Sequence, residues 1–184
     1  LTPLTITVGM MMSQINLSEF SIVQPQTVAW GEMDAFGHVN NASYYRYYES
    51  VRISYLQAIG ALDHLDVMNP VVAANSCRYL VSVSYPDELE IGARVVELRG
   101  SGFRMEYAIV SQQQKCLVAT GEAIVVMVDS QGKKVALPEE MRQIIINLEK
   151  TVGNDLTLDA QNPHKQPETL LGKALSRFSP LRDR

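Results

Sequence analysis

The sequence predicts an α+β domain in which an antiparallel sheet wraps around one long central helix. Apolar residues recur at helical spacing along a single long stretch that begins at Asn41 and ends near Gly60. Several strand-like segments follow this stretch, and short polar turns join them. Strands joined in this way pair antiparallel, and one face of such a sheet must be covered. We therefore expect the helix to cover that face.

The first expected element is a strand over residues 20–30, where apolar residues stand among polar neighbours. Pro25 indicates that this strand lies at an edge of the sheet or carries a bulge. A polar loop over residues 32–40 follows, and Gly37 supplies backbone freedom at its sharpest point. The chain therefore passes from a strand through a turn directly into the long helix.

The long helix is predicted to begin at Asn41. Its apolar stripe advances in steps of three and four residues and consists of Tyr44, Tyr48, Val51, Tyr55 and Ile59. Either Asn40 or Asn41 suits the N-cap, and Gly60 suits the position after the last turn. We expect Tyr44, Tyr48 and Tyr55 to pack in the core rather than to line a pocket.

The rest of the domain is predicted to form a meander, in which each strand pairs with the next along the chain. The expected strands cover residues 71–74, 77–85, 89–98, 103–110 and 117–128. Turns are expected at residues 99–102, 112–114 and 130–133. Pro138 starts a final helix that runs to about residue 148, with acidic residues in its first turn.

The domain itself is expected to cover residues 20–150. Residues 1–19 are expected to form an N-terminal extension, part of which is extraneous to the natural protein. Residues 151–184 are rich in polar residues, glycine and proline, which predicts a loosely held C-terminal tail. Within that tail, residues 168–178 suit a short amphipathic helix.

The composition is ordinary for a globular protein: 184 residues, 46% hydrophobic and 20% charged, with a net charge of -4. The basic residues form no stripe, which argues against nucleic acid as a partner. No apolar run is long enough to cross a bilayer, so no membrane is expected as a partner. Cys77 and Cys116 lack metal-binding or redox spacing, and we expect reduced thiols in a cytoplasmic protein.

Residues with catalytic chemistry gather immediately before the long helix. Asp34, Gly37, His38, Asn40 and Asn41 lie within eight residues of one another. A helix N-terminus presents unpaired backbone N–H groups and a positive dipole end, which stabilise developing negative charge. A carboxylate just before it can act as base or nucleophile on a carbonyl bound there. The alternative is that Asp34 only shapes the turn.

The pattern D-x-x-G-H-V-N-N, followed by the tyrosine-rich helix, resembles the acyl-CoA thioesterases of the hotdog fold, in particular the 4-hydroxybenzoyl-CoA thioesterase-like group. The resemblance extends from about residue 21 to about residue 147. It implies that Asp34 is the catalytic carboxylate and that the backbone N–H of Asn41 binds the thioester carbonyl. It also implies a homo-oligomer, a dimer or a homotetramer built as a dimer of dimers, with active sites between subunits. No cofactor is implied, since coenzyme A is part of the substrate.

Further residues are candidates for contact with the substrate. His38 could hydrogen-bond the thioester carbonyl, hold Asp34 in place, or serve the loop alone. Gly37 is explained by turn chemistry or by close approach of the thioester. The remaining substrate-binding candidates are Asn40, Tyr45, Glu49, Ser101, Gly102 and Arg104.

These remaining candidates each have an alternative role. Tyr45 and Glu49 suit an acyl pocket or a subunit contact. For the turn and strand at Ser101, Gly102 and Arg104, the resemblance implies contact with pantetheine and phosphates, while a plain hairpin explains the same residues.

The leading prediction is an enzyme that hydrolyses an acyl-CoA to a free acid and coenzyme A. No G-x-S-x-G motif is present, which disfavours an α/β-hydrolase, and no cluster of ligands completes a metal shell around Asp34 and His38. General-base and covalent-anhydride routes both stay open. Three alternatives also stay open. One is a thioesterase acting on acyl-carrier proteins, and another is a non-catalytic sensor that binds acyl-CoA. The third, which the resemblance implies, is a hotdog hydratase or dehydratase, although no residues are identified as its His and acid pair. Asp34 separates enzyme from sensor, because a binding module needs no carboxylate against a thioester.

Overall fold

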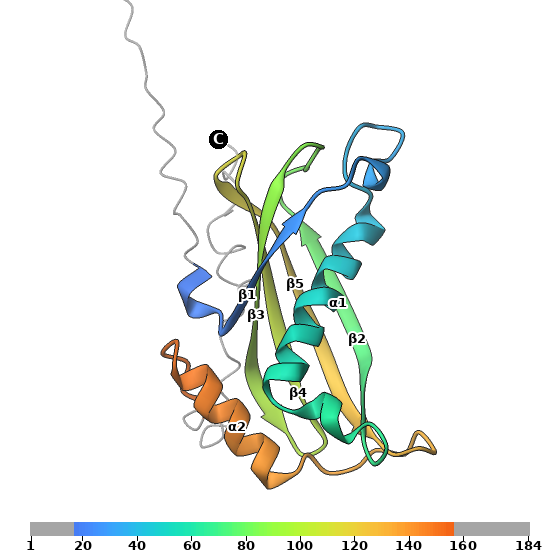
Figure 1. Cartoon of the computed structure of the whole chain (residues 1–184), viewed down its shortest axis with the longest axis vertical. Helices are drawn as coiled ribbons and strands as arrows, with labels where there is room; N and C mark the ends of the chain where they lie inside the picture. The colour runs from blue at the N-terminus through green and yellow to red at the C-terminus, as the bar shows by residue number, and fades with distance from the viewer. Residues whose placement is uncertain (1–16, 157–184) are drawn as a thin grey trace, which may run out of the picture.

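A computed structural model of the chain describes residues 17–156 and shows an α+β fold with one antiparallel sheet of five strands. The long helix lies across one face of the sheet, as the sequence predicts (Figure 1). The elements are η1 (Leu17–Glu19), β1 (Ile22–Thr27), η2 (Trp30–Glu32), α1 (Asn41–Ala58), η3 (Ala61–His64), β2 (Asn69–Tyr79), β3 (Glu88–Arg99), β4 (Gly102–Ser111), β5 (Cys116–Val128) and α2 (Glu139–Lys150).

The bounds of α1 follow from its capping residues. Asn40 is the N-cap, and its side chain accepts a hydrogen bond from the backbone N–H of Ala42 at 2.9 Å. Gly60 follows the helix with a φ of 71°, in the left-handed region that ends helices. The predicted start at Asn41 and the predicted stop at Gly60 are therefore confirmed.

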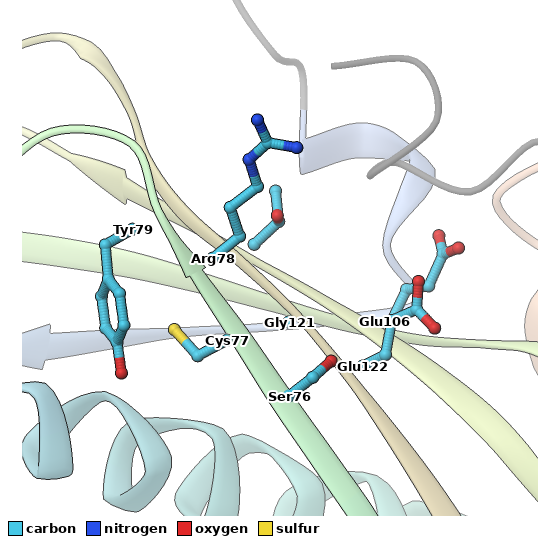
Figure 2. Close-up of a pocket in the computed structure, with 8 residues that line it drawn as sticks. Ser76, Cys77, Arg78, Tyr79, Glu106, Gly121 and Glu122 are labelled. Carbon is cyan, nitrogen blue, oxygen red and sulfur yellow. The ribbon is translucent and has the colours of Figure 1, made fainter. Parts of the chain in front are cut away.

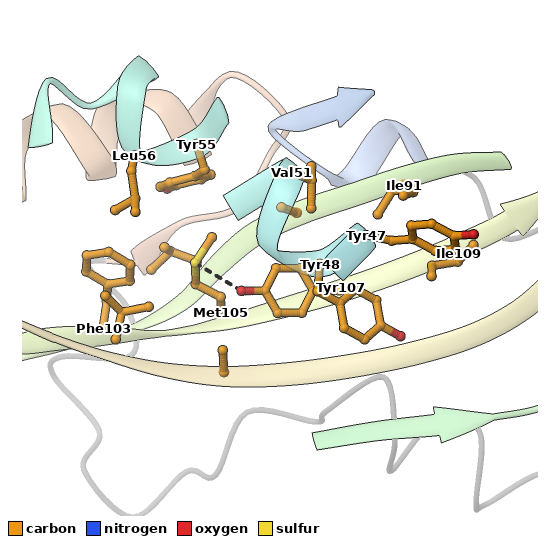
Figure 3. Close-up of a cluster of buried hydrophobic side chains, with 14 of the residues drawn as sticks. Tyr47, Tyr48, Val51, Tyr55, Leu56, Ile91, Phe103, Met105, Tyr107 and Ile109 are labelled. Carbon is orange, nitrogen blue, oxygen red and sulfur yellow. Dashed lines mark hydrogen bonds between the residues drawn. The ribbon is translucent and has the colours of Figure 1, made fainter. Parts of the chain in front are cut away.

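The core lies between α1 and the sheet, and aromatic side chains fill much of it (Figure 3). The fully buried ring of Tyr48 stacks on the ring of Tyr107 from β4, with centroids 4.8 Å apart. Gly121 on β5 makes room for Tyr48, because a Cβ at this position would lie 2.5 Å from the Tyr48 ring. The predicted packing role of Tyr44, Tyr48 and Tyr55 is confirmed, since all three are buried.

The order of the strands in the sheet is β1-β3-β4-β5-β2, which corrects the prediction of a simple meander. The meander is confirmed for β3, β4 and β5, but β2 pairs with β5 at the far edge. The physical reason is that β1 occupies the other edge of β3, with Ile22 opposite Ala93, so β2 finds its free edge on β5. The two strands predicted over residues 71–85 are one strand that ends at Tyr79.

Helix α2 is fixed to the body by the carboxylate of Glu149, which is fully buried. The last β1–β3 pair is Ile22 with Ala93, so the N–H of Val95 lies beyond the reach of β1. Glu149 Oε1 accepts this N–H at 2.8 Å and the hydroxyl of Tyr55 at 2.7 Å. Burial, and then the charge of Glu149, raise the pKa of Tyr55 well above its usual value. One carboxylate therefore joins α1, α2 and the edge of β3.

The turn between β3 and β4 offers a matched pair of glycines for a stability test. A Cβ at Gly102 would overlap the carbonyl oxygen of Val125 and lie 2.9 Å from the Cα of Val126, whereas a Cβ at Gly100 meets nothing within 4 Å. We expect Gly102→Ala to lower the free energy of unfolding by about 1–3 kcal/mol, through overpacking against a backbone. Gly100→Ala should change it by less than about 0.5 kcal/mol. Urea unfolding measures both, and equal effects would contradict the clash.

Candidate active site

The backbone of the loop before α1 forms a closed turn around Asp34. The N–H of Asp34 donates to the carbonyl of His38 at 2.7 Å, and the N–H of Gly37 donates to the carbonyl of Asp34 at 3.1 Å. Gly37 has a φ of 78°, which explains why a glycine stands there. A Cβ on Gly37 would meet nothing within 4 Å. The glycine is therefore required by the turn conformation and not by crowding within the chain.

The Asp34 carboxylate shapes this turn and still keeps one oxygen free. Its Oδ1 accepts the backbone N–H of Phe36 at 2.8 Å and that of His38 at 3.3 Å. Between residues 17 and 156, nothing donates a hydrogen bond to Oδ2. The side chain is half-buried. The structural role and the catalytic role that the sequence offers for Asp34 are thus compatible, because they use different oxygens.

The first turn of α1 leaves one backbone N–H unpaired. The Asn40 side chain takes the N–H of Ala42, and the Asn40 carbonyl takes that of Ser43 at 2.9 Å. The N–H of Asn40 itself donates to the carbonyl of Glu32 at 2.8 Å. Among the described residues, the N–H of Asn41 has no acceptor. The Asn40 amide is therefore already paired, and Asn41 is the free donor within residues 17–156.

Glu32 holds the loop and the helix in this arrangement. Its carboxylate accepts the hydroxyl of Tyr47 at 2.7 Å and the N–H of Ala29 at 2.8 Å, while its carbonyl receives the Asn40 N–H. Burial, and then the hydrogen bond to Glu32, raise the pKa of Tyr47. The sequence analysis missed both residues. No local signal in the sequence points to Glu32, because Ala29, three residues earlier, lacks the side-chain oxygen that a capping box requires.

The segment after β2 supports the turn from the other side. The carbonyl of Val83 accepts the N–H of Val39 at 2.8 Å, and the hydroxyl of Ser84 donates to the carbonyl of Gly37 at 2.8 Å. At the end of β2, the hydroxyl of Tyr79 donates to the carbonyl of Asn41 at 3.3 Å. Residues 83–85, predicted as strand, therefore serve the loop before α1, whereas the N–H groups of Leu80 and Val81 still donate to the carbonyl of Val118 on β5.

Three further candidates lie near this turn with free or partly free side chains. His38 is exposed, and its contact with Asp34 comes from the backbone N–H, not from the imidazole. Tyr45 is half-buried with its ring edge-on to Tyr48, at a centroid distance of 6.4 Å. Glu49 is exposed. The roles proposed for these side chains remain predictions.

Ser101, Gly102 and Arg104 do not join the Asp34 turn within one chain. They follow the end of β3, whereas the turn lies beside its start, and the 12 residues of β3 span roughly 40 Å. The Arg104 guanidinium is buried and already paired, at 3.1 Å with Glu97 and at 3.5 Å with Glu122. Their contact with substrate remains a prediction that requires another subunit.

A separate cavity of about 440 Å³ lies along β2 and β5 (Figure 2). Figure 2 shows Cys77 and Tyr79 directed toward α1 and Arg78 directed away from it. Polar side chains from the sheet line this cavity, including Thr120, whose buried hydroxyl has no hydrogen-bond partner in the described part of the chain. None of the residues that form the Asp34 turn lines it.

Other features of residues 17–156 bear on cofactors and location. No three His, Cys, Asp or Glu side chains gather there as potential metal ligands. Cys77 and Cys116 are free thiols, as predicted. No described helix is long and apolar enough to span a membrane.

Comparison with known proteins places the chain among thioesterases. The family model of the thioesterase-like superfamily matches residues 28–145. A Thermus thermophilus thioesterase, solved as a complex with coenzyme A and zinc, is 32% identical with a TM-score of 0.65. The match covers 72% of this chain and 97% of the Thermus chain.

Two further relatives carry less functional information. The PA5185 protein of Pseudomonas aeruginosa is 31% identical, over 71% of this chain and 92% of its own, with a TM-score of 0.64. The uncharacterized YsmA protein of Bacillus subtilis is 29% identical over 132 residues, which cover 71% of this chain and 88% of YsmA.

Proposed function

The chain belongs to the thioesterase-like superfamily, and from that membership we propose that it hydrolyses an acyl-CoA thioester to a free acid and coenzyme A. One observation carries the proposal. Within residues 17–156, no group donates to one carboxylate oxygen of Asp34, and next to it, at the start of α1, the Asn41 N–H has no acceptor. A base or nucleophile beside an oxyanion donor is the pair that acyl transfer needs.

In the proposed reaction, the thioester carbonyl oxygen accepts the Asn41 N–H as negative charge develops on it. Along the general-base route, Asp34 Oδ2 takes a proton from water, the water oxygen attacks the carbonyl carbon, and the C–S bond breaks to release the thiolate. Along the nucleophilic route, Oδ2 attacks the carbon and expels the thiolate, and water then hydrolyses the mixed anhydride. Neither route requires a metal or a redox cofactor.

His38 completes the proposed site in a secondary role. Its backbone N–H helps to hold Asp34 Oδ1, which leaves the exposed imidazole available to the thioester carbonyl or to the leaving group. Glu32 and Tyr47 act through other groups: they fix Asn40, and through Asn40 the position of the Asn41 amide.

The proposal includes a second copy of the chain. No described strand pairs with the outer edge of β2, which carries the exposed side chains Val71, Val72 and Tyr79. A strand edge of this length is a template for another strand. We place a two-fold axis at this edge, so that two sheets join into one and Asp34 faces the partner. A dimer of dimers and a cytoplasmic location, which the two free thiols favour, complete the proposal.

Release of free thiol from a panel of acyl-CoAs, short to long and aromatic, tests the function. We expect turnover of at least one member, with kcat in the range of about 1–1000 s⁻¹ that is common for enzymes. Tight binding of acyl-CoA without turnover would instead indicate a sensor. Turnover confined to acyl-carrier-protein thioesters, supplied in parallel, would change the substrate class and keep the chemistry.

A further inference from the structure

Arg52 is a buried cation that has no anionic partner among the described residues. It lies in α1, the residue is 6% exposed, and its Nη1 donates to the hydroxyl of Tyr107 at 3.2 Å. Across residues 17–156, no carboxylate lies within the 4.0 Å of an ion pair with this guanidinium. A guanidinium carries five N–H donors, and burying its charge without compensation is costly. The remaining donors of Arg52 thus lack the anion that its burial calls for.

Arg52 lies farther along α1 from the Asp34 turn than Tyr48 does. Tyr48, one helical turn earlier, approaches Cys77 Sγ on β2 at 3.4 Å, and its ring stacks on Tyr107. Tyr107 in turn receives the Arg52 hydrogen bond. A row of contacting side chains therefore joins Cys77, Tyr48, Tyr107 and Arg52.

The distance along α1 from Asn41 to Arg52 matches the length of an acyl group. Arg52 stands 11 residues after Asn41, which is about 16 Å along the helix. Helical side chains lean toward the N-terminus, so the guanidinium lies nearer to the Asn41 amide than its own Cα does. Asn75, which shares a sheet face with Cys77 two residues away, adds an exposed carboxamide on β2.

We propose that Arg52 binds a carboxylate at the far end of the acyl group, so that the preferred substrates are CoA esters of dicarboxylic acids. This inference rests on the proposed thioesterase function and names its substrate class. Tyr107 positions the guanidinium, and the methylene chain spans the distance of about 16 Å between the Asn41 amide and Arg52. Arg52 determines specificity and takes no part in the chemistry, which stays with Asp34.

The test compares glutaryl-, adipoyl-, suberoyl- and sebacoyl-CoA, each with the fatty acyl-CoA of the same carbon number. The ratio of kcat/KM within each pair is measured for wild type, Arg52→Met, Arg52→Lys and Lys150→Met. Methionine keeps an unbranched stem without the charge, and lysine keeps the charge. Lys150 is an exposed cation in α2, far from Asn41 in the sequence, and its variant controls for net charge.

We expect wild type to prefer the dicarboxylic ester of at least one pair, and Arg52→Met to lower that ratio by about 10- to 100-fold, the loss of a charge-assisted hydrogen bond. The change should appear mainly in KM. Arg52→Lys should retain part of the preference, and Lys150→Met all of it. The melting temperature of Arg52→Met should be unchanged or higher, because a buried charge has been removed.

Other results would overturn the inference. An unchanged kcat/KM ratio between dicarboxylic and fatty acyl esters in Arg52→Met would do so. If that variant also lost self-association, the carboxylate that pairs with Arg52 would come from a second copy of the chain. If wild type hydrolyses no panel member, calorimetry with free suberate decides. If wild type binds suberate and Arg52→Met does not, the carboxylate site stands although the thioesterase proposal fails. If wild type does not bind suberate, the carboxylate site and the thioesterase proposal are both rejected.

Discussion

Replacing Asp34 with asparagine should lower kcat for thioester hydrolysis by about 10²- to 10⁴-fold, the usual contribution of a general base. The substitution is informative because of how the carboxylate is held. The amide oxygen of asparagine can still accept the N–H groups of Phe36 and His38, so the turn keeps its geometry. The second position becomes an NH₂ group, which can neither take a proton from water nor attack a carbonyl.

Two variants separate chemistry from turn structure. Asp34→Ala loses the turn hydrogen bonds as well, and we expect an additional loss of about 1 kcal/mol in the free energy of unfolding. Asp66→Asn removes one exposed carboxylate elsewhere and should leave kcat unchanged. Thiol release and urea unfolding measure all three. Near-wild-type kcat in Asp34→Asn would reduce Asp34 to a turn residue and reject the mechanism.

The predictions that depended on local signals were the accurate ones. The start of α1 at Asn41 and its end before Gly60 follow from capping chemistry that neighbouring residues determine. The buried tyrosines follow from helical periodicity alone. The hydrogen bonds that Asp34 itself makes are also local, since they join residues no more than four apart, although Ser84 holds the same turn from a distant part of the chain.

What the sequence analysis missed depends on long-range contacts. The hydrogen bond from Tyr47 to Glu32 joins residues 15 apart, and no sequence pattern in either segment predicts this contact. The strand order could not be predicted either, because the edge on which β2 pairs depends on where β1 already lies. The candidates Ser101 and Arg104 came from the family resemblance; within one chain the length of β3 separates them from Asp34, and their contact with substrate stays a prediction.

Arg52 shows the same limit in a single residue. On the helical pattern it lies next to the apolar stripe, and an arginine there reads as a surface residue with its stem on the core. Only the tertiary structure shows that Arg52 is 6% exposed and that its guanidinium contacts a phenol. No carboxylate of the described residues lies within ion-pair distance of it. Burial and pairing together turn an ordinary arginine into a candidate specificity residue.

The second large effect is expected at Glu149, in stability and not in catalysis. Glu149→Ala should lower the free energy of unfolding by about 3–5 kcal/mol, as for a broken buried charge network. Its Oε1 accepts donors from Ser21, Tyr55 and Val95, and its Oε2 accepts the side-chain amide of Asn154. Alanine would leave the buried Tyr55 hydroxyl and Val95 N–H without this acceptor, and each such loss costs about 1–3 kcal/mol before relaxation. Ser21 and Asn154 would keep second acceptors, the carbonyls of Ala93 and Glu19.

A graded series distinguishes lost hydrogen bonds from lost packing at this site. Glu149→Gln can keep an oxygen at the position of Oε1, where three of the four donors meet, so we expect a smaller loss of about 1–2 kcal/mol. Glu140→Ala, an exposed carboxylate in the same helix, should change stability by less than about 0.5 kcal/mol. Urea unfolding gives the three values. If the alanine variant at Glu149 were no less stable than the glutamine variant, the buried carboxylate would not be what fixes α2, because hydrogen-bond acceptors are the main difference between the two.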